Sequence, residues 1–245
     1  MSRVKEHIFN FEEGEMLLID KPLEWTSFDV VKSLRIFLKK TYNLKKLKVG
    51  HAGTLDPLAS GLLILCTGRM TKQIDEFQGM DKVYIGQMTL GATTPSFDKE
   101  TETDQSFPIA NIHTDDLKQA SLKFKGEIEQ IPPIYSAIKI EGKRAYKSAR
   151  KDQDVKMKSR KVTIYEFDLL NFTPPFLDFS VKCSKGTYIR SLVNDFGKSL
   201  NNGAYLSDLR RTKIGDYSVN DAVTIDNFKQ KVLSQLPNTS PDMTT

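Results

Sequence analysis

The sequence has few of the residues on which disulfide frameworks and metal sites depend. It contains two cysteines and three histidines in 245 residues. Cys66 and Cys183 are far apart in the chain, and no Cys-x-x-Cys pair occurs. The sequence therefore predicts neither a disulfide scaffold nor a structural zinc site. A reducing environment suits such a chain, so we expect a cytoplasmic protein.

Long apolar runs are also missing. No window approaches the roughly 18 uninterrupted apolar residues of a membrane span. The opening stretch MSRVKEHIFNFEEGE carries charges where a signal peptide needs an apolar run. We therefore expect a soluble protein that is neither inserted in a membrane nor exported.

Several patterns that mark cofactor and metal enzymes are absent as well. The chain has no GxGxxG, GxxxxGK[ST], HExxH or GxSxG segment. A nucleotide cofactor, an ATP-driven reaction and a zinc mechanism thus have no support in the sequence.

The net charge of +5 is unevenly distributed along the chain. Residues 32–48 contain seven basic and no acidic residues, and residues 139–161 contain ten basic against three acidic ones. Each stretch therefore carries +7, which leaves −9 for the remainder. This distribution is expected of a protein that grips a polyanion such as a nucleic acid at defined places. Two solvated lysine-rich faces are the alternative interpretation of the charge alone.

The order of apolar patterns predicts a mixed α+β fold. A chain of this length allows one large domain or two small ones. Strands are expected at residues 14–20, 47–50, 62–66, 83–90, 162–172, 176–183 and within 204–219. Helices are expected at residues 27–40, 74–77, 115–125, 187–200 and 226–236, with Thr26, Ser27 and Thr114 as N-caps. Residues 93–107 are polar and indicate a loop.

One carboxylate stands out in the turn-rich stretch between two apolar runs. Residues 50–61, GHAGTLDPLASG, contain three glycines, one proline and the single acidic residue Asp56. An Asp before Pro is most often an ordinary turn residue. A functional role for Asp56 therefore depends on the other motifs of the chain.

These motifs together resemble a known family. The segment GHAGTLDPLASG is similar to the signature of the TruB family of tRNA pseudouridine synthases, in which the corresponding Asp is the catalytic carboxylate. Further matches follow in the family's order. They are Lys21-Pro22 with Thr26-Ser27, Tyr84 with Leu90-Gly91, PPIYSA at 132–137, CSKGTYIR at 183–190, and LRRT at 209–212. The resemblance covers about residues 14–228.

The resemblance implies a fold and a domain organisation. It implies the pseudouridine synthase fold, a mixed and largely antiparallel sheet flanked by helices and loops. Residues 1–236 would form the catalytic domain with a basic insert around 139–161, and residues 237–245 a flexible tail. Family members often continue into a C-terminal RNA-binding domain of PUA type, and we expect none here. The default oligomeric state for this family is a monomer.

The resemblance also implies a reaction and its catalytic group. The reaction would isomerise uridine to pseudouridine at position 55, in the T-loop of tRNA. It breaks the bond from N1 to C1′, rotates the uracil and joins C5 to C1′, so no redox change occurs and no cofactor is needed. Asp56 would attack the nucleoside or stabilise a cationic sugar, and Arg190 would be its counter-ion.

Other positions carry expected substrate-binding roles by the same resemblance. Tyr84 would stack on the flipped uracil and is a candidate for handling the C5 proton, while Tyr188 would line the pocket beside Arg190. His51 would take up the space that the flipped base vacates. Lys21, Lys72 and Leu209 are expected to shape the pocket, and no metal ligand is expected.

The chain departs from the family pattern at a few positions. Glu24 stands where the family usually has Gly, and Thr94-Pro95-Ser96 replaces the usual Asp-Thr pair. Asp152, Lys156 and Met157 alter the pattern of the basic insert. Two alternatives therefore stay open at this point: a pseudouridine synthase that acts on another RNA, and an RNA-binding or RNA-folding factor in which catalysis is secondary.

Overall fold

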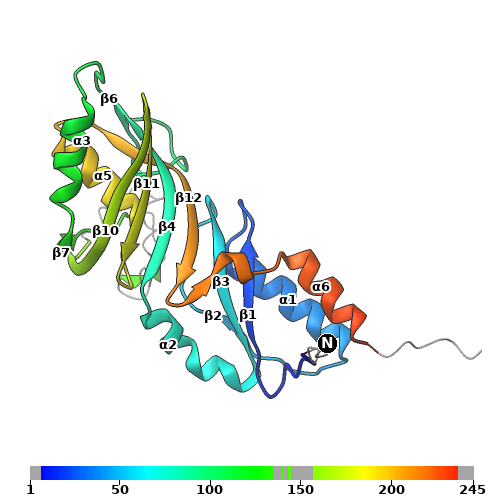
Figure 1. Ribbon diagram of the computed structural model, residues 1–245. Coiled ribbons are helices and arrows are strands. Elements are labelled where there is room, and N and C mark those ends of the chain that lie inside the picture. The colour runs from blue at the N-terminus through cyan, green and yellow to red at the C-terminus, as the bar shows by residue number, and fades with distance from the viewer. Residues whose placement is uncertain (1–6, 135–138, 141–142, 145–156, 237–245) are drawn as a thin grey trace, which may run out of the picture. The chain divides into compact units, whose positions relative to one another are not determined.

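A computed structural model describes residues 7–134, 139–140, 143–144 and 157–236 (Figure 1). The chain forms two compact units. Unit 1 comprises Met1–Gln78 and Tyr217–Thr245, and unit 2 comprises Gly79–Asp216. Both units combine strands with helices, which confirms the α+β class. Most of the expected basic insert and the whole expected tail lie outside the described residues, so the division into catalytic domain, insert and tail stays a prediction.

Unit 1 is built on short antiparallel strands covered by two helices (Figure 1). Strand β3 pairs with β1 from Met16↔Cys66 to Lys21↔Gly61, and with β2 from Val49↔Thr67 to His51↔Leu65. The elements are β1 (Met16–Lys21), α1 (Ser27–Thr41), β2 (Val49–His51), β3 (Ala59–Thr67), η1 (Gly68–Gln73), α2 (Ile74–Gly79), β13 (Tyr217–Ser218), η2 (Val219–Asp221) and α6 (Ile225–Ser234).

Helix α1 forms where the sequence predicts it. Its buried residues Val30, Val31, Leu34 and Leu38 recur at helical spacing and pack in a core with β1, β3 and α6. Thr26 is the N-cap: its hydroxyl accepts from the Asp29 N–H, and the Asp29 carboxylate accepts from the Thr26 N–H, both at 3.0 Å. The basic residues of α1 therefore lie on its outward face.

Unit 2 contains a five-stranded antiparallel sheet in the order β12-β4-β11-β10-β7. Its elements are β4 (Lys82–Leu90), β5 (Ala92–Thr93), β6 (Gln105–Ser106), α3 (Thr114–Leu122), β7 (Gly126–Gln130), β8 (Lys139–Ile140), β9 (Lys143–Arg144), β10 (Arg160–Thr173), β11 (Phe176–Cys183), α5 (Ile189–Ser199) and β12 (Ala204–Ile214). Helix α5 packs on β12, and α3 packs on β10 and α5.

One face of this sheet forms the core of unit 2 with α5. Strand β4 alternates as the sequence predicts, with Tyr84 and Met88 buried and Ile85 exposed. On the same face, the ring of Phe167 lies 5.9 Å from that of Phe179 in β11 and 5.7 Å from that of Phe196 in α5. The start of α5 is thereby positioned on the side of the sheet that carries Tyr84.

Three local expectations need correction. Helix α3 begins at Thr114 rather than after it, because the Asp116 carboxylate accepts from the backbone N–H of His113 one residue earlier. The loop expected at 93–107 contains the short β5–β6 hairpin, with Ala92 opposite Ser106. Strand β7 was not expected, since its sequence GEIEQ has a single large apolar residue. It pairs with β10, from Arg160↔Gln130 to Ile164↔Gly126.

Among the described residues, no helix is both long and apolar enough to cross a bilayer.

Candidate active site

Asp56 lies in the loop that joins β2 to β3 in unit 1. The N–H of Ala59 donates to the backbone oxygen of Asp56 at 3.1 Å, which closes a turn through Pro57. Gly53 adopts φ +91°, a conformation that side chains disfavour, so the approach to this turn requires glycine. The Asp56 side chain is partly buried. The turn-rich sequence thus positions one carboxylate at the end of a strand.

Hydrogen bonds from the start of α1 hold this loop on both sides of Asp56. The Ser27 hydroxyl accepts from the N–H of Leu55 at 2.8 Å and donates to the Leu55 carbonyl at 3.1 Å. The Glu24 N–H donates to the Pro57 carbonyl at 2.8 Å. We call these contacts the clamp. They explain why the Thr26-Ser27 pair accompanies the Asp56 segment: Thr26 caps the helix and Ser27 fixes the loop.

Lys21 holds the backbone on both sides of Glu24, a residue of the clamp. Its side chain is fully buried, and its ammonium donates to the carbonyls of Pro22 at 2.7 Å and Trp25 at 2.6 Å. A buried ammonium needs such acceptors, because an unpaired charge in the protein interior is costly. Lys21 thereby fixes the turn that carries Glu24.

Glu24 explains one departure from the family pattern. Its φ is +65°, in the left-handed region that glycine adopts without strain. The family pattern has glycine at this position because glycine adopts a positive φ without strain.

We predict that Glu24→Gly stabilises the protein slightly. Relief of the left-handed strain is worth about 1 kcal/mol, and the greater freedom of glycine in the unfolded chain offsets about half of it. Urea denaturation should show a net gain of about 0.5 kcal/mol. Glu24→Ala retains a Cβ and should show no gain. A loss of stability in Glu24→Gly would contradict this account.

Two other predicted site residues lie in unit 1. His51 is the last residue of β2, opposite Leu65 of β3, and is partly buried at the entrance to the Asp56 loop. Lys72 lies on η1, directly after β3, and its side chain is exposed. The structure brings His51 and Asp56 onto the same connection between two strands, and it places Lys72 at the far end of β3.

In unit 2, Tyr84 and Leu209 share one face of the sheet. Tyr84 is opposite Arg211, and Gly86 is opposite Leu209, in the β4–β12 pair. Residues two apart on a strand face the same side, so Tyr84 and Leu209 are diagonal neighbours. A side chain at Gly86 would meet the ring of Phe179 at 2.8 Å. The two predicted pocket residues are therefore brought together over a position that only glycine can fill.

Arg190 forms a buried ion pair that the sequence analysis missed. Its Nη1 lies 3.2 Å from Oδ2 of Asp98, and the two side chains are 4% and 7% exposed. The same nitrogen donates to the backbone oxygen of Ser96 at 3.3 Å. Asp98 therefore fixes the guanidinium at the first turn of α5.

A network of short polar side chains orders the loop that carries Asp98. The Thr94 hydroxyl donates to the Asp98 carbonyl at 2.7 Å, and the Ser96 hydroxyl does so at 3.2 Å. Oδ1 of Asp98 accepts from the N–H of Glu100 at 2.9 Å. Thr94, Ser96 and Asp98 are all buried. The polar segment is thus a structured loop around Arg190, and Thr94 and Ser96 of the altered Thr94-Pro95-Ser96 sequence supply two of its hydrogen bonds.

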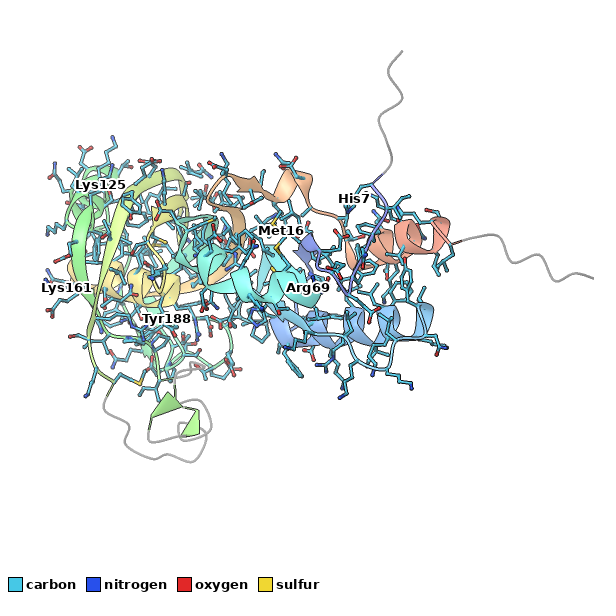
Figure 2. The ribbon with its side chains drawn as sticks, turned by 90° about the horizontal axis from the view of Figure 1, so that it is seen from below. His7, Met16, Arg69, Lys125, Lys161 and Tyr188 are labelled. Carbon is cyan, nitrogen blue, oxygen red and sulfur yellow. The ribbon has the colours of Figure 1, made fainter. Side chains whose placement is uncertain are left out.

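Tyr188 is held at the N-terminus of α5 (Figure 2). Its N–H donates to Oε1 of buried Gln130 at 2.7 Å, and Nε2 of Gln130 donates back to the Tyr188 carbonyl at 3.0 Å. The Arg160 guanidinium lies 5.2 Å from the centroid of its ring. Gln130, on the unexpected strand β7, thereby positions a residue of the CSKGTYIR motif.

Burial changes the pKa of one group in unit 1 and of two groups in unit 2. It raises the pKa of the Cys66 and Cys183 thiols to about 11. Burial, and to a lesser extent the charge of Arg211, lowers the pKa of Lys82 to about 8. Both thiols are thus protonated at neutral pH and are poor nucleophiles. Among the described residues, no group of His, Cys, Asp and Glu side chains gathers in the numbers that a metal ion needs.

Two protein-family models together match residues 39–239 of the chain. Residues 39–189 match the model of the N-terminal domain of TruB family pseudouridylate synthases. Residues 190–239 match the model of the tRNA pseudouridylate synthase B C-terminal domain. The chain belongs to the TruB family.

Curated TruB relatives are similar to this chain over nearly their whole length. The chain is 53% identical over 221 residues to the tRNA pseudouridine synthase B of Flavobacterium johnsoniae, covering 90% of this chain and 96% of the relative. It is 50% identical to the enzyme of the same name from Phocaeicola vulgatus, over 90% of this chain and 94% of the relative. The chain is thus a tRNA pseudouridine synthase of the TruB family, an isomerase.

Solved structures confirm the pseudouridine synthase fold. A chain of a Cbf5-Nop10-Gar1 complex is similar with a TM-score of 0.65 and 27% identity, over 90% of this chain and 54% of that one. A chain of an H/ACA RNP bound to a substrate RNA containing 2′-deoxyuridine is similar with a TM-score of 0.64 and 25% identity, over 93% of this chain and 57% of that one.

The TruB motif residues are divided between the two units. Unit 1 holds Asp56, His51, Lys21 and Lys72, whereas unit 2 holds Tyr84, Tyr188, Arg190 and Leu209. Arg190 pairs with Asp98 inside unit 2. The expected pairing of Arg190 with Asp56 joins the two units and stays a prediction.

Proposed function

We propose that this enzyme converts uridine to pseudouridine at position 55 in the T-loop of tRNA, with Asp56 as the catalytic carboxylate. The observation that carries the proposal is the Asp56 loop itself. Its GHAGTLDPLASG sequence belongs to the TruB family, and the clamp holds the backbone on both sides of the carboxylate. Such fixation suits a group that must meet one sugar carbon in one orientation.

Asp56 has the chemistry that the isomerisation needs. The glycosidic bond breaks with positive charge developing at C1′, and an ionised carboxylate either attacks that carbon or stabilises the charge. The uracil stays in the site, turns, and returns through C5. No electrons or atoms leave the nucleotide, so the proposal includes no cofactor.

The residues of unit 2 are proposed to receive the base. The uridine must leave its stack to be reached, and enzymes that modify bases flip the target into a pocket. Tyr84 and Tyr188 offer aromatic faces for stacking, and Tyr84 is a candidate for handling the C5 proton. The Arg190 guanidinium, fixed by Asp98, supplies a positive charge beside the base and is the proposed counter-ion of Asp56. Leu209 provides an apolar wall next to Tyr84.

The remaining motif residues are proposed to support the site. His51, beside the Asp56 loop, would occupy the space that the flipped base leaves. Lys21 would shape the pocket through the turn that it holds, and Lys72 through its position after β3.

A T-stem-loop transcript incubated with the wild-type protein and no added cofactor tests the proposal. Pseudouridine should form at the T-loop uridine, as mapped by chemical labelling and primer extension. Product at a different uridine in total RNA, with none in the T-loop, would favour a synthase that acts on another RNA. Binding without any product would favour an RNA-binding or RNA-folding factor.

Electrostatic contacts to phosphates are proposed to supply much of the affinity. The exposed face of α1 carries Lys32 and Lys40, with Arg35 and Lys39 partly exposed. By contrast, Lys125 and Lys161 in unit 2 (Figure 2) lie 3.7 and 2.8 Å from the carboxylates of Asp168 and Glu127. Pairing with a carboxylate weakens the attraction of Lys125 and Lys161 for RNA, whereas the four basic residues of α1 share one acidic residue, Asp29. We therefore propose α1 as a backbone-binding element.

Affinity for the T-stem-loop should therefore fall steeply with salt. We predict that Lys32→Gln lowers the magnitude of the slope of log K against log salt by about 1, because one phosphate contact is lost. The control is Lys118→Gln, since Lys118 on α3 lies 3.7 Å from Asp115. Filter binding from low to high salt measures both slopes. Salt-insensitive binding would contradict the role of α1.

We further propose that the enzyme works as a cytoplasmic monomer. Two thiols that burial keeps protonated and the +7 segment at residues 32–48 suit a reducing compartment that contains tRNA. Sedimentation equilibrium at micromolar concentration tests the monomer.

A further inference from the structure

Large apolar side chains are exposed around the clamp. Trp25 is 37% exposed, Phe28 is 59% exposed, and Leu23 and Leu58 are also exposed. Single exposed apolar residues are ordinary, whereas a group of them marks a binding surface. We call these four residues the Trp25 surface.

The clamp joins the Trp25 surface to the catalytic loop. Leu23 and Trp25 flank Glu24, whose N–H is bonded to the carbonyl of Pro57, the residue before Leu58. Phe28 follows Ser27, which is bonded to Leu55. Asp56 lies between the two bonded positions of the loop. The exposed aromatic rings and the carboxylate are therefore parts of one hydrogen-bonded structure.

Hydrogen bonds hold the backbone that carries the Trp25 surface. The Lys21 ammonium holds the carbonyl of Trp25, and the capping box of Thr26 and Asp29 fixes the backbone that leads to Phe28. Rings on a fixed backbone bind a flat partner with less loss of conformational entropy. The rings are therefore exposed on a backbone that hydrogen bonds fix in place.

The charges around the Trp25 surface favour a nucleic-acid base as its partner. Glu24 and Asp29 are exposed beside it and disfavour a phosphate there. Lys32 and Lys39 follow Phe28 at spacings of four and eleven, so they lie on the same side of α1. A nucleic acid whose phosphates lie along α1 would bring a base, rather than a phosphate, onto the aromatic rings.

We propose that Trp25 and Phe28 stack on an unpaired base of the substrate RNA next to the target uridine. The proposal rests on the proposed function, because it assumes that the RNA loop is held at Asp56. Neither ring is among the residues assigned to the site by the family motifs. They act as positioning residues that hold the loop while the uridine is flipped.

The test measures equilibrium binding of T-stem-loop RNA by the wild type, Trp25→Ala, Phe28→Ala and Trp25→Phe. Loss of one stacked base weakens binding by about 10-fold, so each Ala variant should show this loss in Kd. Trp25→Phe, which keeps an aromatic ring, should lie near the wild type. Leu233→Ala, at an exposed apolar residue of α6, is the matched control and should bind as the wild type does.

An abasic scan of the RNA identifies the base. Removal of one unpaired loop base should weaken wild-type binding about 10-fold, yet change binding by Trp25→Ala less than twofold.

Three results would overturn the proposal. One is unchanged Kd in both Ala variants, and another is an equal effect of every abasic RNA on wild type and variant. The third is a wild-type dimer in sedimentation that Trp25→Ala converts to a monomer, because the surface would then hold a second copy of the chain. A wild type that binds RNA but makes no pseudouridine refutes the proposed function instead, since the stacking measurements need only binding.

Discussion

Replacement of Asp56 by Asn is expected to abolish pseudouridine formation while RNA binding is retained. The neutral amide cannot attack C1′ or offset positive charge on the sugar, so the rate should fall by on the order of 10⁴-fold or more. The fold should persist, because Asn has nearly the same shape as Asp and the clamp holds the loop through backbone groups of Leu55 and Pro57. Chemical labelling of pseudouridine in a T-stem-loop measures the rate, and filter binding measures the affinity.

Asp75→Asn is the matched control for this variant. Asp75 is an exposed carboxylate in the first turn of α2, also in unit 1, and its loss removes the same charge. It should retain wild-type turnover. Turnover in Asp56→Asn above about a hundredth of the wild-type rate would contradict the assignment of Asp56 as the catalytic carboxylate.

Regular elements with a strong pattern could be predicted from the sequence. The apolar residues of α1 recur at helical spacing between a capping Thr26 and a polar loop, and the helix observed at Ser27–Thr41 follows that pattern. Strand β11 occupies the predicted residues 176–183, because alternation is strict and turns bound it on both sides. In these cases, local sequence determines both the kind and the limits of the element.

Elements that depend on partners elsewhere in the chain could not be predicted. Strand β7 exists because β10 pairs with it from Arg160↔Gln130 onward, and its own five residues carry little pattern. The segment around Asp98 is polar and was expected to be a plain loop. It is buried because Arg190, more than 90 residues later, bonds to Ser96 and Asp98.

The candidate site shows the same division. Asp56, Tyr84 and Arg190 were identified through the family motifs, which are continuous in the sequence. The residues that hold them are scattered, namely Ser27 for the Asp56 loop, Gln130 for Tyr188 and Asp98 for Arg190. Nothing near Asp98 distinguishes it from Glu102 or Asp104 before the fold is known.

Loss of the Asp98 carboxylate is expected to weaken both folding and catalysis. Asp98→Asn has nearly the same shape and can still accept from the N–H of Glu100, but it removes the carboxylate that pairs with the buried Arg190 guanidinium. Removal of one partner of a buried pair costs about 3 kcal/mol or more. For a chain of this size, the midpoint of thermal unfolding should fall by about 6–12 °C. Misplacement of the guanidinium should lower kcat about 100-fold with a smaller change in KM.

A double variant separates the two effects. Asp98→Asn combined with Arg190→Met removes both charges of the Arg190–Asp98 pair, so its unfolding midpoint should lie above that of Asp98→Asn alone. Its kcat should nevertheless be no higher than that of Asp98→Asn, because Met cannot supply the positive charge that Arg190 is proposed to place beside the base. The control Glu102→Gln removes an exposed carboxylate of the same loop and should change neither stability nor kcat. If the double variant were as unstable as the sum of the single variants, the pair would contribute packing rather than charge compensation. If Asp98→Asn kept wild-type kcat, Asp98 would serve the fold alone and Arg190 would hold its position without it.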